Sequence, residues 1–231
     1  MIKKLVCGIG MVMLCCSLGF AQPVGIFTGQ VSIGDDNFLG EVTFANGVYS
    51  MLASGNDLWG SFDGAYYAYQ VVTGNFTAQC TVEWETPFVG DFWKKMGLMA
   101  RDSVSAPDDP GARHATAVII RDLFSNLQTR REPAGGSDDI VYSDAEVVSN
   151  YVGSDNRSTI RLVRTGTQFN MWRLNVANVW EDLGFIDLPG ISDTILVGIV
   201  VTSHNTSVIE QAFFRDVSIT ASTAVSNYSL Y

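Results

Sequence analysis

The segment from Phe76 to Glu85 alternates strictly between apolar and polar side chains. Its apolar members fall on one face of an extended strand: Phe76, Ala78, Cys80, Val82 and Trp84. The polar residues between them fall on the other face. A strand with one apolar and one polar face belongs to a sheet that is covered on one side. On this face we expect Cys80 to act as a small buried hydrophobic residue rather than as a reactive thiol.

Similar short segments recur along the chain between clusters of Gly, Asn, Asp and Ser, and no helix longer than a turn or two is expected. Further strands are predicted at 25–33, 48–53, 65–72, 95–102, 115–122, 126–131, 158–164, 168–175, 195–203 and 212–220. Two segments with proline or paired glycines, 103–112 and 133–139, are predicted to be surface loops. The pattern indicates an all-β fold, a two-sheet antiparallel sandwich.

The N-terminus has the features of a secretory signal peptide. Lys3 and Lys4 precede an apolar run from Leu5 to Leu18, and Gly19-Phe20-Ala21 fits a small-x-small cleavage site. A lipoprotein is disfavoured because no small residue stands directly before Cys15. We therefore predict a signal peptide over residues 1–21.

The rest of the chain is predicted to be one sandwich domain over residues 22–221, followed by a short polar tail at 222–231. Such a protein would be secreted, extracellular or periplasmic, without membrane insertion after cleavage. The predicted signal holds three of the four cysteines, so Cys80 would remain alone and no intramolecular disulfide could form. A chain of this length can instead rely on its hydrophobic core.

The charge of the chain excludes some partner classes. The formal net charge is -10, and removing Lys3 and Lys4 with the signal would make it -12. Nucleic acids and anionic membranes select for basic surfaces. Neither is therefore expected as a partner.

The stretch from Ser54 to Asp63 is a Gly-, Asn- and Asp-rich turn that leads into a Trp and then an aromatic segment. Its Asp57-Leu58-Trp59-Gly60, with Asp63, resembles the Asp-Ile-Trp-Gly-x-x-Asp motif of concanavalin A-like, LamG-type bacterial domains. The resemblance continues in order at residues 72–76, 93–101, 127–130, 160–164, 197–204 and 214–217.

The resemblance implies a jelly roll of two curved antiparallel sheets in an extracellular protein related to carbohydrates. It does not fix the activity, because this fold carries lectins, hydrolases, lyases and adhesion modules.

Known catalytic patterns are not found in the sequence. The Glu-x-Asp-x-x-Glu strand motif of laminarinase-like enzymes is missing, and Glu83 and Glu85 share a strand face without a third carboxylate. His114 and His204 are the two histidines, and neither has the spacing of a metal site or a Gly-x-Ser-x-Gly partner. We expect both histidines to be structural or exposed, and the protein not to be an enzyme.

Two strand faces carry side chains suited to sugars. One face has an aromatic residue followed by polar and sulfur-containing groups, and a second strand adds an amide and a guanidinium. If both faces line the concave sheet, they form a polar groove with an aromatic wall. The predicted carbohydrate-binding residues are Trp93, Lys95, Met99, Arg101, Gln128 and Arg130.

The alternative interpretation of these residues is structural. Trp59 and Trp93 could pack in the core or at its rim, and Arg101 and Arg130 could form buried ion pairs. Both interpretations stay open at this point.

Asp57 and Asp63 are predicted to bind nearby backbone amides in the turn, together with Trp59 as a structural motif. Acidic loops at 35–37, 108–109 and 138–139 could contribute calcium ligands, but none has the spacing of an EF-hand. We therefore predict no cofactor, with calcium as a weaker alternative.

The leading functional prediction is a non-catalytic, lectin-like domain that binds an extracellular glycan or polysaccharide. One alternative is a structural or adhesion module that binds protein at the cell surface. Another is an atypical carbohydrate-active enzyme.

Overall fold

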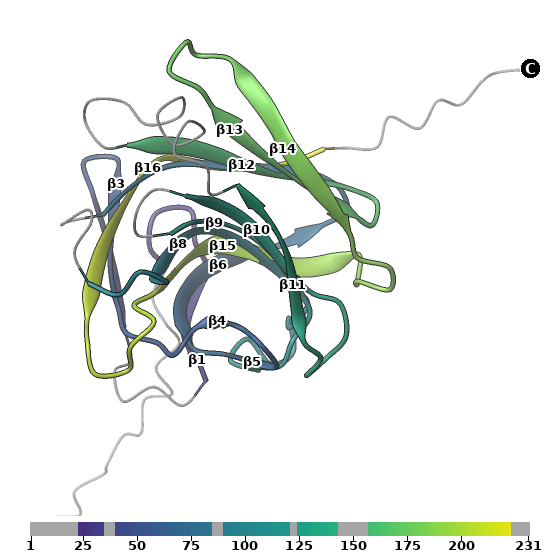
Figure 1. The fold of residues 1–231 in the computed structure, drawn as a ribbon, viewed down its shortest axis with the longest axis horizontal. Helices are drawn as coiled ribbons and strands as arrows, with labels where there is room; N and C mark the ends of the chain where they lie inside the picture. Colours follow the sequence, from purple (N-terminus) through teal and green to yellow (C-terminus); the bar gives the residue numbers. More distant parts are fainter. Residues whose placement is uncertain (1–22, 35–39, 85–89, 121–123, 143–156, 223–231) are drawn as a thin grey trace, which may run out of the picture.

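The computed structural model describes residues 23–34, 40–84, 90–120, 124–142 and 157–222. These residues form two seven-stranded sheets and one two-stranded hairpin (Figure 1), and they include no helix. Every strand pair is antiparallel, which confirms the predicted two-sheet sandwich. The described residues thus contain no helix long and apolar enough to cross a membrane.

The first sheet is called the concave sheet because it curves around the hairpin in Figure 1. In spatial order it contains β1 (Gly29–Ile33), β6 (Ala65–Thr73), β15 (Thr194–Thr202), β8 (Lys95–Arg101), β9 (His114–Ile120), β10 (Ser125–Arg130) and β11 (Ser137–Tyr142). The second, the back sheet, contains β14 (Trp180–Asp187), β13 (Gln168–Leu174), β12 (Ser158–Thr165), β7 (Phe76–Trp84), β16 (Glu210–Ala221), β3 (Val48–Ala53) and β2 (Glu41–Ala45). The hairpin consists of β4 (Leu58–Trp59) and β5 (Phe62–Asp63).

The main core lies between the two sheets. In β7, buried and half-buried residues alternate without exception, as the sequence predicts, and Cys80 is fully buried. From the concave sheet, Met96, Leu98 and Ala100 of β8 join the same core. Burial of each large side chain contributes roughly 1.5–3 kcal/mol, so this core can hold the fold without a disulfide.

All eleven predicted strands are present, and the loop predicted over residues 103–112 is confirmed. The sequence missed β2, β11, β14 and the two short strands of the hairpin. The loop predicted over residues 133–139 is wrong at its end, because β11 begins at Ser137 and pairs with β10. β11 and β14 are edge strands with acidic residues, and edge strands tolerate charges that interrupt the alternation.

The hairpin lies across the concave face. Its strands are joined through Gly60, which has a φ of 66° that glycine adopts without strain. Leu58 is directly opposite Asp63, and Trp59 is opposite Phe62. Directly opposite residues share one face of a hairpin. Leu58 and Asp63 therefore face the sheet and are buried, whereas Trp59 and Phe62 face away from it and are exposed.

The predicted signal peptide lies outside the described residues, as do Glu85, the acidic loop at 35–37 and all of the tail beyond Ser222. The Ser222 amide donates a hydrogen bond of 2.8 Å to the carbonyl of Asn75.

Candidate functional site

Asp63 fastens the hairpin to the concave sheet. Its carboxylate accepts two parallel hydrogen bonds of 2.7 Å from the guanidinium of Arg130 and one of 2.5 Å from Arg101. All three side chains are fully buried. Such bidentate, charge-assisted bonds are both strong and directional. Arg130 also donates to the carbonyl of Gly60, at 3.2 Å, and so fixes the turn of the hairpin.

This anchor changes the interpretation of three predicted binding residues. Arg101 and Arg130 form the buried ion pairs of the alternative interpretation, and Asp63 accepts from them rather than from turn amides. Met99 lies in a second apolar cluster with Leu58, between the hairpin and the sheet. Met99, Arg101 and Arg130 do share the concave face, but the hairpin covers them. They are therefore not accessible to a ligand in this structure.

His114 completes the buried anchor, as expected for a structural histidine. Its Nε2 lies 3.7 Å from Oδ1 of Asp63, and burial lowers the pKa of His114 to about 3. For Asp63, burial acts to raise the pKa, but His114, Arg130 and Arg101 outweigh it and lower the pKa below its usual value. At neutral pH the anchor is therefore a carboxylate between two guanidinium groups and a neutral imidazole.

Beside the hairpin, the concave sheet leaves a groove with a cavity volume of about 440 Å³. It is lined by Asp57, Trp59, Trp93, Lys95, Asn126, Gln128, Asp139 and His204. The space between these residues is called the groove below. It brings together three predicted binding residues, Trp93, Lys95 and Gln128, with the motif residues Asp57 and Trp59.

Aromatic rings form part of the groove wall. Trp93 is 49% exposed and Trp59 is 41% exposed, so neither packs in the core. The Trp93 ring contacts the edge of Phe92, with ring centroids 4.9 Å apart, and Phe92 contacts Phe124. These contacts hold an exposed indole in one place, which favours stacking with a ligand because less freedom is lost on binding.

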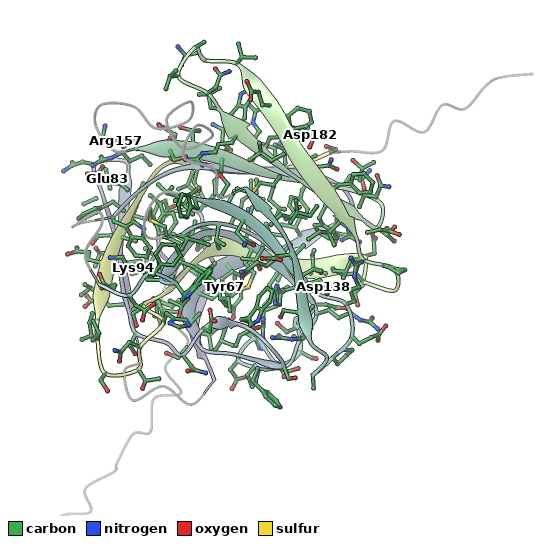
Figure 2. The ribbon with its side chains drawn as sticks, in the orientation of Figure 1. Tyr67, Glu83, Lys94, Asp138, Arg157 and Asp182 are labelled. Carbon is green, nitrogen blue, oxygen red and sulfur yellow. The ribbon has the colours of Figure 1, made fainter. Side chains whose placement is uncertain are left out.

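The chain next to Trp93 is fixed from inside the molecule. Lys94 is fully buried (Figure 2), and its ammonium group lies 2.9 Å from the carboxylate of Glu210 and 4.4 Å from the centre of the Trp84 ring. The amide of Trp93 donates a hydrogen bond of 2.8 Å to Asp91. The position of Trp93 is therefore set by a buried ion pair and a backbone turn.

Asp57 connects the hairpin to both of its neighbours in the groove. Its carboxylate accepts hydrogen bonds from the amide of Leu58, at 2.7 Å, and from Lys95. His204 lies 3.3 Å from the carboxylate of Asp57 and 3.0 Å from that of Asp91. Among the described residues, Nδ1 of His204 has no aligned hydrogen bond, so its contact with Asp91 is one of proximity. His204 thus links the base of the hairpin to the turn that carries Trp93.

Two buried amide side chains on β10 line the groove. Asn126 is 1% exposed and Gln128 is 2% exposed. Among the described residues, neither Oδ1 of Asn126 nor Oε1 of Gln128 has a hydrogen-bond partner. Asn126 donates through Nδ2 to Asp139, at 2.8 Å. A buried acceptor without a donor is costly, so a hydroxyl group from a ligand would be favoured here.

Asn126 and Asp139 were not predicted as groove residues from the sequence, and His204 was expected to be structural or exposed. Asn126 could have been predicted, because it lies two residues before Gln128 and four before Arg130 and therefore shares their face of β10. Asp139 was placed in a loop, so its pairing with Gln128 across β10 and β11 could not be foreseen.

The described residues contain no group of three or more His, Cys, Asp or Glu side chains that could hold a metal ion. Asp109 binds the amide of Gly111, and Asp138 lies 3.4 Å from Arg131. Glu83 pairs with Arg157 at 2.8 Å on the back sheet (Figure 2). Glu83 therefore lies away from the groove.

No protein-family model and no curated protein sequence matches the chain. Solved structures do match it, at low sequence identity. A functionally unknown protein from Saccharomyces cerevisiae has a TM-score of 0.60 at 17% identity, over 84% of this chain and 97% of that one. The fold is a concanavalin A-like jelly roll.

Two further solved structures with this fold are a GH43 protein and a lectin. The GH43 protein BlXynB from Bacillus licheniformis has a TM-score of 0.55 at 10% identity, over 84% of this chain but 39% of that one. The metal-free form of lectin I-B4 from Griffonia simplicifolia has a TM-score of 0.50 at 9% identity, over 80% and 92% of the two chains. At these identities the likeness establishes the jelly roll and not its activity.

Proposed function

We propose that the protein is a secreted, lectin-like domain that binds a neutral glycan in the groove without turning it over. The observation that carries this proposal is the pairing of two fixed, exposed tryptophans, Trp59 and Trp93, with the buried acceptors of Asn126 and Gln128. Sugar rings have apolar faces, which stack on aromatic rings, and hydroxyl groups around their edges, which donate to amide oxygens.

The charges near the groove favour a neutral ligand. Lys95 is already bound to Asp57, and His204 lies between Asp57 and Asp91. Asp139 adds a further carboxylate. With a net charge of -10 on the whole chain, an anionic polysaccharide would meet repulsion rather than a free cation.

The carboxylates of the groove support binding rather than glycoside hydrolysis. A general acid needs a carboxyl group in apolar surroundings that favour its protonated form. Asp57 instead has Lys95 and His204 as partners, and Asp139 accepts from Asn126. The proposal therefore includes no catalytic residue and no metal cofactor.

The solved structures that share this fold are compatible with the proposal. A lectin and a GH43 protein share the jelly roll, so a carbohydrate-related role is compatible with this architecture. The Asp-Leu-Trp-Gly-x-x-Asp stretch adds the resemblance to LamG-type bacterial domains, and the N-terminal pattern adds a predicted secretory signal peptide.

The proposal is tested by a thermal-shift and calorimetry screen of the protein against neutral and acidic polysaccharides, with calcium and with a chelator. A ligand that binds only the native state raises the melting temperature by mass action. We expect neutral glycans to raise it equally with calcium and with chelator, and to release no new reducing ends on incubation.

Trp93→Ala should lower the affinity about two- to twelvefold while leaving the fold intact, since one stacked ring contributes roughly 0.5–1.5 kcal/mol. The matched control is Phe185→Ala, which removes an equally exposed aromatic ring from β14 of the back sheet. If Trp93→Ala keeps the full affinity for the glycan, the groove is not the binding site. Binding to proteins but not to glycans would support an adhesion module instead.

A further inference from the structure

On the other side of the hairpin lies a second hollow, with a cavity volume of about 630 Å³. Phe62 of β5 forms one part of its wall, and the end of β1 and the loop between β8 and β9 contribute Ser32 and Asp108. Asn56, Asp63 and Thr206 add further polar groups to its lining. The proposed function assigns no role to this hollow or to Phe62.

The second hollow and the groove are neighbours on one surface. Asn56 lines the hollow, and the next residue, Asp57, lines the groove. Likewise, Thr206 in the hollow comes two residues after His204 in the groove. The hairpin separates the two spaces, and its outward face carries Trp59 toward the groove and Phe62 toward the hollow.

Phe62 is exposed although its strand is held firmly. Its side chain is 61% exposed, while the next residue, Asp63, is bound by Arg101 and Arg130. The amide of Asp63 also donates to the carbonyl of Pro110, at 2.9 Å. Phe62 therefore stays at the surface because its anchored neighbour holds it there, and not because the hairpin is loose.

The exposed rings form a sequence across this surface. Trp93 stands at the groove, Trp59 on the hairpin beside it, and Phe62, directly opposite Trp59 in the hairpin, beside the second hollow. Exposed aromatic rings in a row, with polar groups beside them, fit a chain of linked sugar rings better than a single sugar.

We propose that the hollow beside Phe62 is a second sugar subsite, so that the protein binds a glycan chain that crosses the hairpin from the groove to this hollow. This inference rests on the proposed function, because it takes the groove as the first subsite. The Phe62 ring stacks on a sugar of the chain, and Asn56 and Thr206 supply polar contacts to its hydroxyl groups. Asp108 adds an acceptor and disfavours acidic sugars.

The test uses neutral oligosaccharides of graded length, from disaccharide to hexasaccharide, of β-1,4-glucan, β-1,3-glucan and β-1,4-xylan. Calorimetry measures their affinity for the wild-type protein, Phe62→Ala, Phe62→Tyr, Trp93→Ala and the control Phe185→Ala. We expect the affinity to rise about two- to twelvefold between the shortest and longest members of the series that binds, as one added stacked ring would give.

Phe62→Ala should remove this gain for the long chains and leave the affinity for the disaccharide unchanged. Phe62→Tyr should restore the gain, because it keeps the ring. Phe62 is largely exposed, so its variants should melt at the wild-type temperature.

The two proposals fail in different ways. Equal affinity for short and long chains, or full affinity of Phe62→Ala for the hexasaccharide, overturns the second subsite while the groove stands. Wild-type affinity of Trp93→Ala for every chain, or no binding in any series, overturns the proposed function and the second subsite with it.

Discussion

Asp63 lies at the centre of the anchor under the hairpin, where one carboxylate meets Arg101, Arg130 and His114. Desolvating these charges costs free energy, which the bidentate geometry offsets. Removing the Asp63 carboxylate costs much more stability than the intact ion pairs contribute. The reason is that two buried guanidinium groups would keep their charge without a counter-ion.

We predict that Asp63→Asn lowers the free energy of unfolding by roughly 3–5 kcal/mol. Urea denaturation followed by tryptophan fluorescence measures this change. Asp138→Asn is the control, since Asp138 is 70% exposed beside Arg131 and its loss should cost under about 0.5 kcal/mol. Equal effects of the two variants would contradict the anchoring role of Asp63.

His114 gives the stability a defined pH dependence. Its pKa is about 3 in the folded protein and near 6.5 when exposed, so between these values the unfolded chain binds the extra proton. Acidification through this window therefore favours unfolding. We expect His114 to account for about 2 kcal/mol of lost stability between pH 6.5 and pH 4.5.

Urea titrations at several pH values measure this effect in the wild-type protein and in His114→Gln. Other titrating groups contribute to both proteins, so the difference between the two pH slopes isolates His114. Identical slopes would show that His114 titrates normally in the folded protein.

At the level of elements, the hairpin of β4 and β5 decides what the concave face can contact. Leu58 fixes its apolar side, because it is fully buried in a cluster with Met99 and Tyr67. The hydroxyl of Tyr67 donates to the carbonyl of Met99, at 3.0 Å, beneath the same hairpin. The hairpin is therefore held by one apolar contact region and one ionic anchor.

Leu58→Ala should destabilise the docked hairpin by roughly 2–5 kcal/mol, because it leaves a cavity under a short element. Hydrogen exchange of the hairpin and the rate of limited proteolysis near Ser61 report its release. Val179→Ala, at a 53% exposed site before β14, should change neither. An unchanged exchange rate in Leu58→Ala would mean that the polar contacts of Asp57, Gly60 and Asp63 are sufficient to hold the hairpin.

Edge elements show where strand prediction fails. β11 and β14 each pair with one neighbour, so their sequences are less constrained than those of central strands. The pairing of β14 with β13 also shifts register between Met171 and Trp172 of β13, which interrupts the simple alternation in β14. Asp139 was consequently assigned to a loop, although it lines the groove from β11.

On the scale of the whole molecule, stability comes from the core between the two sheets. Cys80 lies in that core without exposed surface, and burial raises the pKa of its thiol. Both effects oppose reaction, because the thiolate is the nucleophile and a reagent must reach it.

In protein that lacks residues 1–21, we therefore predict no labelling of Cys80 by a thiol reagent under native conditions and one label per chain in denaturant. Mass spectrometry counts the labels. A reducing agent should leave the melting temperature unchanged. Rapid native labelling would show that the sheets separate locally at β7.

The local pattern of the sequence was sufficient for the sandwich, since alternation reports which side chains share a face of a strand. It correctly placed Cys80 in the core and put Lys95, Met99 and Arg101 on one face of β8. What covers that face depends on contacts between residues far apart in the chain. Asp63 and Arg130 are 67 positions apart, and no periodicity connects them. Only the folded hairpin separates the groove, which Trp93, Lys95 and Gln128 line, from the covered Met99, Arg101 and Arg130. The reason is that burial is a property of the assembled layers and not of any one strand.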